Sequence, residues 1–209
     1  VKTLFIELDG TLIDSHSALF KVYSSFLEIY GKKGSELEFD ELKGPSISEI
    51  AAILKHRYQL QKTVPELCED YKNLLRTHYF TFVEFFPHAI ETLTYAKSRG
   101  YKLVLVTSAE RSFVDKILSL KNIFDLIVTA DGLQKSKPDP AIYRQALKVS
   151  DALPEDVIAI EDSLNGVEAA NKAGIRTWRI RHRIGQGVVQ ISDECLEVDN
   201  WKTIHRLLA

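Results

Sequence analysis

Phe5-Ile6-Glu7-Leu8-Asp9-Gly10-Thr11 joins the end of a buried strand to a turn that carries two carboxylates. The apolar run from Thr3 to Leu8 is short and strand-like, and glycine-containing sequence follows it directly. Glu7 and Asp9 are separated by one residue, so both carboxylates are expected near the strand end. Such a pair suits a hard cation. The stretch therefore predicts a strand whose carboxyl end carries the chemistry of the protein.

Similar apolar runs recur along the chain and alternate with segments of helical spacing. The further predicted strands are Lys102 to Thr107, Phe124 to Thr129, Val157 to Ile160 and Arg176 to Ile180. The predicted helices are Ala89 to Arg99, Ser112 to Lys121, Asp139 to Val149 and Asn165 to Ala173. Strand and helix alternate from Pro87 onward, which predicts an α/β fold with a doubly wound, Rossmann-like parallel sheet.

The stretch from about Ser15 to Phe86 breaks this alternation, because it contains helix-like segments and no convincing strand. Its first apolar residues recur at intervals of three and four, as one buried helix face requires: Leu19, Val22, Tyr23, Phe26, Leu27 and Tyr30. We therefore expect residues 15–86 to form an all-α cap inserted after the first strand. Residues 1–14 and 87–209 are expected to form the catalytic core.

Polar residues follow the predicted strands at the edge where open parallel sheets bind ligands. Thr107 and Ser108 supply hydroxyl and backbone N–H groups that suit a phosphoryl oxygen, and Lys137 supplies a positive charge. Glu161 and Asp162 place a second acid pair at the same edge. Each element alone also fits a turn, a helix cap or a solvated loop. Their shared position predicts a site for phosphate and Mg²⁺.

Composition and charge narrow the classes of partner. The net charge of -2 and pI near 6.3 offer no basic excess for nucleic acid or an anionic membrane. Cys68 and Cys195 lack metal-ligand spacing, and no apolar run suggests a signal peptide or a membrane span, so we expect a cytoplasmic protein with unpaired thiols. The sequence does not indicate an oligomeric state.

Two further groups of polar residues are given structural roles. The six histidines show no ligand spacing, and most are expected at the surface or in packing. His16 could alternatively face the site from the cap hinge, and His88 could stiffen that hinge. Arg179, Arg181 and Arg183 alternate along a late strand and are expected on a solvated sheet edge. Trp178 and Trp201 are interpreted as packing residues.

Four segments closely resemble the haloacid dehalogenase-like superfamily, and the resemblance covers essentially the whole chain. They are Leu8-Asp9-Gly10-Thr11-Leu12-Ile13-Asp14-Ser15, Val106-Thr107-Ser108, Lys137-Pro138-Asp139-Pro140-Ala141-Ile142-Tyr143 and Ile160 to Ala170. The helical insert, with Lys43-Gly44-Pro45-Ser46, resembles the branch of β-phosphoglucomutase and phosphoglycolate phosphatases. The resemblance implies a Mg²⁺-dependent phosphatase acting on a small phosphorylated metabolite. A phosphosugar mutase is the near alternative, and a dehalogenase fits the lysine and paired acids less well.

The resemblance also implies roles for individual residues. A strand-end carboxylate would attack phosphorus and form an acyl phosphate. Asp9 would act as general acid and base, and its backbone carbonyl would help to hold Mg²⁺. Thr107 and Lys137 would bind the phosphoryl oxygens. Asp162 would ligate Mg²⁺, with Glu161 assisting directly or through water.

The nucleophile position falls on Glu7, where the family pattern has aspartate. The additional methylene displaces the attacking oxygen by up to about 1.5 Å. Glu7 could also serve as a metal ligand. Three interpretations remain open: a working glutamyl nucleophile, a site that only binds phosphate and Mg²⁺, and an inactivating substitution that traps substrate.

Overall fold

The computed structural model describes residues 2–42, 44–82, 84–116, 122–182 and 187–209, with no side-chain description for residues 80–82. These residues divide into two compact units, one made of residues 1–13 and 85–209 and the other of residues 14–84. The sequence analysis placed the corresponding boundaries at residues 14 and 86. Lys43, Arg183 and the last five residues of the predicted helix from Ser112 to Lys121 lie outside the described residues.

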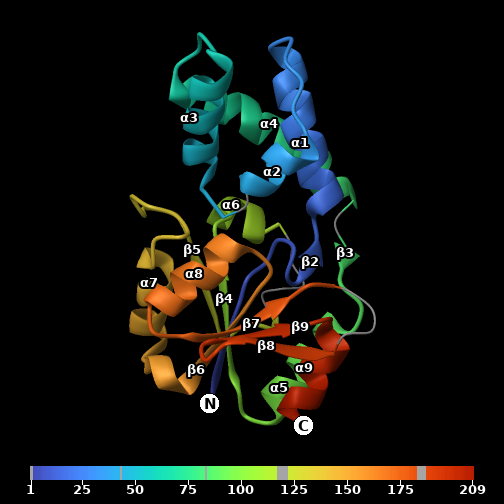
Figure 1. The fold of residues 1–209 in the computed structure, drawn as a ribbon, viewed down its shortest axis with the longest axis vertical. Coiled ribbons are helices and arrows are strands. Elements are labelled where there is room, and N and C mark those ends of the chain that lie inside the picture. The colour runs from blue at the N-terminus through green and yellow to red at the C-terminus, as the bar shows by residue number, and fades with distance from the viewer. Residues whose placement is uncertain (1, 43, 83, 117–121, 183–186) are drawn as a thin grey trace. The chain divides into compact units, whose positions relative to one another are not determined.

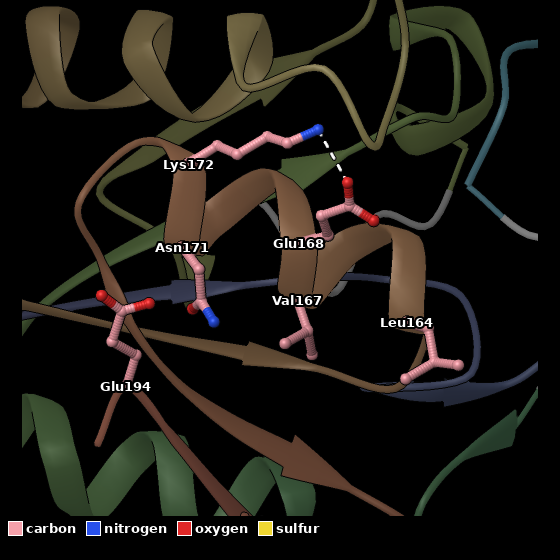
Figure 2. Close-up of a pocket in the computed structure, with 6 residues that line it drawn as sticks. All are labelled: Leu164, Val167, Glu168, Asn171, Lys172 and Glu194. Carbon is pink, nitrogen blue, oxygen red and sulfur yellow. Dashed lines mark ion pairs between the residues drawn. The ribbon is translucent and has the colours of Figure 1, made fainter. Parts of the chain in front are cut away.

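The larger unit is built on one sheet with the strand order β5-β4-β1-β6-β7-β9-β8 (Figure 1). The strands are β1 (Thr3–Ile6), β4 (Lys102–Thr107), β5 (Leu126–Thr129), β6 (Val157–Glu161), β7 (Arg176–Ile180), β8 (Val188–Ser192) and β9 (Cys195–Val198). Neighbouring strands are parallel except β8 and β9, which are antiparallel. The chain adds β4 and β5 on one side of β1 and then β6 and β7 on the other, so the sheet is doubly wound, as predicted.

Helices cover both faces of this sheet (Figure 1). The helices on these faces are α5 (Ala89–Ser98), α7 (Ala141–Ser150), α8 (Leu164–Lys172) and α9 (Trp201–Leu208). The short helix α6 (Arg111–Val114) follows β4, and a 3₁₀ turn lies at Pro154–Asp156. Helix α7 packs on β4 and β5 and α8 packs on β6 and β7, whereas α5 packs with α9. The apolar strands are buried because both of their faces are covered.

The smaller unit is helical and contains α1 (His16–Ile29), α2 (Glu36–Glu41), α3 (Ile47–Tyr58) and α4 (Val64–Phe82). Helix α4 packs against both α1 and α3. The predicted apolar stripe of α1 is largely buried, with Val22, Tyr23, Phe26 and Leu27 inaccessible to solvent. Phe26 packs on Tyr71 of α4 with ring centroids 5.3 Å apart. The fold is therefore an α/β sheet core with an inserted all-α unit.

Several local predictions were wrong. The stretch from Ser15 to Phe86 does contain a strand, β3 (Glu84–Phe85), which pairs with β2 (Ile13–Asp14) in a two-residue ribbon where the chain passes between the units. The described part of the predicted helix from Ser112 to Lys121 is shorter than expected. Helix α6 ends at Val114, because the backbone N–H of Lys116 donates to the carbonyl of Phe113 and closes a tighter turn.

The predicted solvated edge was also wrong. Strand β7 lies between β6 and β9, inside the sheet. Its Arg179 donates to the carbonyl of Asp162 at 3.2 Å and faces Glu197 of β9 at 3.6 Å. Strand β9, Cys-Leu-Glu-Val, is only four residues long and was not predicted from the sequence, and it covers the edge that β7 was expected to leave open.

Candidate active site

The backbone register brings three predicted site segments to one edge of the sheet. Ile6 of β1 lies opposite Leu105 of β4 and Ile160 of β6. The next residue, Glu7, donates its N–H to the carbonyl of Ile160 at 3.1 Å. Glu7, Glu161 and Thr107 therefore lie at the carboxyl ends of neighbouring strands. The winding direction changes between β1 and β6, so this edge is the expected ligand-binding position of an open parallel sheet.

A buried lysine joins the two glutamates at this edge. Lys137 is 2% exposed, and its Nζ contacts the carboxylate of Glu7 and lies 2.6 Å from Oε1 of Glu161. Glu7 is 6% exposed and Glu161 is fully buried. One positive charge therefore faces two carboxylates in a place that water does not reach freely. The structure brings together three of the residues that the sequence assigned to the site.

Burial shapes the protonation of this cluster. Removal from water, opposed by Lys137 and reinforced by Glu161, raises the pKa of Glu7 to about 7. Burial acts to lower the pKa of Lys137, but the carboxylates of Glu161 and Glu7 outweigh it and raise that pKa above its ordinary value. The lysine accordingly stays charged at neutral pH.

Tyr143 of α7 completes the cluster, although the sequence analysis gave it no role. Its hydroxyl donates to Oε1 of Glu161 at 2.5 Å, and Nζ of Lys137 lies 5.3 Å from the centre of its ring. The ring also stacks on Phe5 of β1 with centroids 6.4 Å apart. Burial, followed by the charge of Glu161, raises the pKa of Tyr143 well above its ordinary value, so the phenol remains a hydrogen-bond donor.

The Glu161 carboxylate also depends on a glycine in α8. A side-chain carbon at Gly166 would collide with the carboxyl group of Glu161. Helix α8 begins after Ser163, whose hydroxyl accepts from the N–H of Gly166 at 3.0 Å. The Ser163 N-cap and the absence of a side chain at Gly166 together allow α8 to begin directly behind Glu161.

One acid of each predicted pair, Asp9 and Asp162, lies at or beside the turn that follows β1. Gly10 has a φ of +74°, and the carboxylate of Asp162 packs so closely on it that a side chain there would collide. Oγ1 of Thr11 donates to Oδ1 of Asp162 at 3.1 Å. Asp162 is thus fixed against the backbone that immediately follows Asp9.

Thr107 is the last residue of β4, and Ser108 follows it at the same edge. Thr107 is fully buried, and its Oγ1 accepts from the N–H of Ala109 at 3.1 Å, which shapes the turn after the strand. The N-cap of α6 is Glu110, so Thr107 does not cap that helix. In its contact with Ala109 the hydroxyl oxygen only accepts, so the hydroxyl proton can be donated to a ligand.

The carboxylate and carbonyl oxygens at this edge are ligands of the type that Mg²⁺ prefers. Their arrangement limits which of the predicted residues could bind the ion. Across the described ranges, no three His, Cys, Asp or Glu side chains converge as a metal-binding group. Glu7 and Glu161 are instead engaged by Lys137. Mg²⁺ commonly uses only one or two carboxylates together with substrate phosphate and water. The carboxylate of Asp162, which packs on Gly10, and the backbone carbonyl of Asp9 would meet that requirement.

Two C-terminal residues that the sequence analysis treated as packing residues contact the turn after β1. Nε2 of His182 lies 3.0 Å from the carbonyl oxygen of Gly10, and Nε1 of Trp201 donates to the carbonyl of Thr11 at 2.9 Å. Neither residue belongs to a recognisable sequence motif, and only the tertiary fold brings them to the turn that follows Asp9.

Among the described helices, none is both long enough and apolar enough to cross a membrane.

Comparisons with known proteins find relatives that match most of the chain. A phosphorylated carbohydrates phosphatase of Thermotoga maritima is 29% identical over 191 residues, which cover 90% of this chain and 88% of that protein. The pyrophosphatase PpaX of Bacillus anthracis is 28% identical over 88% of this chain and 86% of its own. The crystal structure of CbbY from Rhodobacter sphaeroides in complex with phosphate has the same fold, with a TM-score of 0.79, 22% identity and coverage of 96% and 95% of the two chains.

The family model of haloacid dehalogenase-like hydrolases matches residues 5–180, a range that holds both acid pairs, Thr107 and Lys137. The chain belongs to the haloacid dehalogenase-like hydrolase family.

Proposed function

We propose that this chain is a Mg²⁺-dependent phosphatase that hydrolyses a small phosphorylated metabolite through an acyl phosphate on Glu7. The observation that carries the proposal is the buried Lys137, held between Glu7 and Glu161 at the switch point of the sheet. A lysine in this place can bind the oxygens of a transferring phosphoryl group beside the attacking carboxylate. The named activities of the Thermotoga and Bacillus relatives support the same class of reaction.

The proposed reaction has two steps. A carboxylate oxygen of Glu7 attacks phosphorus, the bond to the leaving oxygen breaks, and Asp9 gives that oxygen a proton. Asp9 then takes a proton from water as the water oxygen attacks phosphorus, which releases inorganic phosphate and regenerates Glu7. Lys137 and Thr107 bind phosphoryl oxygens in both steps. The backbone carbonyl of Asp9 and the carboxylate of Asp162 would hold Mg²⁺, which would offset part of the negative charge of the phosphoryl group.

A second candidate function is phosphate binding without turnover. It is favoured by the direct contact between Glu7 and Lys137, because the longer side chain places its carboxylate on the phosphate-binding cation. In that case phosphate would have to displace Glu7, and the attacking oxygen would not be aligned with phosphorus. A phosphosugar mutase remains a further alternative that differs in the acceptor of the phosphoryl group.

Phosphate release from sugar phosphates, phosphoglycolate and pyrophosphate in the presence of Mg²⁺ tests the proposal. We expect hydrolysis by the wild-type chain and its loss in Lys137→Ala. Lys135→Ala is the matched control, because Lys135 lies in the same loop with a side chain 76% exposed, 3.9 Å from Asp139. Circular dichroism checks that each variant is folded. Retained hydrolysis in Lys137→Ala contradicts the proposal, and isomerisation of a sugar phosphate without net release of phosphate indicates the mutase.

A further inference from the structure

The turn after β1 holds itself together through three backbone hydrogen bonds. Gly10 donates to the carbonyl of Ile13 at 3.0 Å, and Leu12 and Ile13 donate to the carbonyl of Leu8 at 2.9 and 3.0 Å. These bonds do not use the carbonyls of Gly10 and Thr11, which accept from side chains far along the sequence. The turn is therefore also held from outside, by ring N–H groups.

His182 and Trp201 supply these N–H groups. A carbonyl oxygen can only accept, so Nε2 of His182 carries a proton in its 3.0 Å contact with Gly10. Nε1 of Trp201 donates to Thr11 from a fully buried ring. Both donors lie C-terminal to residues 5–180, the range that matches the family. They belong to the part of the chain that the shared motifs do not explain.

His182 is itself fixed in place. It follows β7 with a φ of 49°, an uncommon conformation for a residue with a side chain. Its ring stacks on Phe86 with centroids 3.3 Å apart and an interplanar angle of 11°. The N–H of Phe86 donates to the carbonyl of Leu12 at 3.0 Å. His182 thus contacts both the outgoing and the returning segment of the larger unit, and it can act as a rigid donor.

We propose that His182 is a positioning residue that fixes the backbone next to Asp9. Glycine has the greatest conformational freedom of any residue, and Gly10 directly follows Asp9. The hydrogen bond from His182 holds the carbonyl of Gly10 and so restrains the peptide that joins Gly10 to Thr11. It thereby limits the rotation of Gly10 and restrains the direction of the Asp9 carboxylate. Trp201 restrains the next peptide in the same way. This inference rests on the proposed role of Asp9 as general acid and base.

Two substitutions separate the hydrogen bond from the ring stacking. His182→Phe keeps an aromatic ring on Phe86 but has no N–H, whereas His182→Gln places an amide N–H near the position of Nε2. We expect His182→Phe to lower kcat about tenfold, with KM changed less than about twofold, since one hydrogen bond that orients a reacting group is lost. His182→Gln should retain kcat within about threefold of the wild type. Equal loss in both variants would overturn the proposal.

A measurement that needs no turnover accompanies the kinetics. Amide hydrogen exchange followed by NMR should show the N–H of Gly10 exchanging about tenfold faster in His182→Phe and near the wild-type rate in His182→Gln. His205→Phe is the matched control, because His205 stacks on Tyr95 at 4.4 Å. Unchanged exchange in His182→Phe overturns the positioning role. Faster exchange in a chain without phosphatase activity supports that role and contradicts the proposed function instead.

Discussion

The glutamate at the nucleophile position offers the most direct test of the proposed chemistry. Glu7→Asp removes one methylene and retracts the carboxylate by about 1.5 Å along the side chain. In the structure this carboxylate contacts Lys137 at a buried site, with little room for adjustment. A displacement of roughly 1 Å in a reacting group can change a rate about a hundredfold. We expect Glu7→Asp to raise kcat by up to about a hundredfold, equivalent to roughly 2.7 kcal/mol of barrier.

The assay compares Mg²⁺-dependent phosphate release by the wild type, Glu7→Asp and Glu7→Gln under identical conditions. Glu7→Gln is nearly isosteric but lacks a nucleophilic carboxylate, so it should be inactive. A trapped phosphoryl group on the peptide that contains residue 7 would identify the attacking side chain by mass spectrometry. Activity that survives in Glu7→Gln refutes the acyl-phosphate mechanism. Activity found only in Glu7→Asp excludes Glu7 as a working nucleophile and supports phosphate binding without turnover.

Three further substitutions test contacts around the site and in the sheet. Gly166→Ala should destabilise the fold by about 1–3 kcal/mol in urea denaturation, because its methyl group would collide with buried Glu161, and unchanged stability would contradict that packing. Tyr143→Phe should lower the free energy of unfolding by about 1–2 kcal/mol, because Glu161 loses a hydrogen bond, and an equal or higher value would count against the contact. Asp125 tests the dependence of stability on pH. Burial acts to raise its pKa, but the backbone N–H of Leu103, which donates to Oδ2 of Asp125 at 2.8 Å, helps to hold that pKa below the ordinary value of 3.8. The ionised form is favoured by folding, so Asp125→Asn should cost stability near pH 6, and the difference from wild type should shrink as pH falls below 3.8; a constant difference would refute the assignment.

The predictable part of the fold is the part with strong apolar patterns. The runs that include Val104 and Ile160 are buried on both faces of the sheet, so their sequence is almost continuously apolar. Strand β8, Val-Val-Gln-Ile-Ser, was not predicted as a strand, and its apolar residues do not mark a buried strand because all five residues are exposed. Strand β9 is only four residues long, with buried residues at its two ends and partly buried residues between them. Pairing with neighbouring strands stabilises both of these strands, and such pairing is not visible in a local window of sequence.

The candidate site shows the same division. Lys137 and Glu161 were predicted at the same edge of the sheet, Lys137 to bind phosphate and Glu161 to assist Mg²⁺, and in the structure their nitrogen and oxygen lie 2.6 Å apart. Tyr143 lies in the first turn of α7, and its hydroxyl reaches Glu161 only because α7 packs behind β4 and β5. His182 and Trp201 reach the Asp9 turn through the tertiary fold alone. Contacts made across the sheet depend on packing, whereas strand-end chemistry can be predicted from order along the chain.

The charge of the cluster explains why one methylene matters so much here. With both glutamates ionised, Lys137 leaves a net charge of minus one in a site from which water is largely excluded. A phosphate group brings further negative charge, so it must compete with Glu7 for the only cation in this three-residue cluster. An aspartate at position 7 would withdraw its carboxylate from Lys137 and leave the nitrogen free to contact a phosphoryl oxygen. Side-chain length thus controls two properties at once, the position of the attacking oxygen and the availability of the positive charge that binds phosphate.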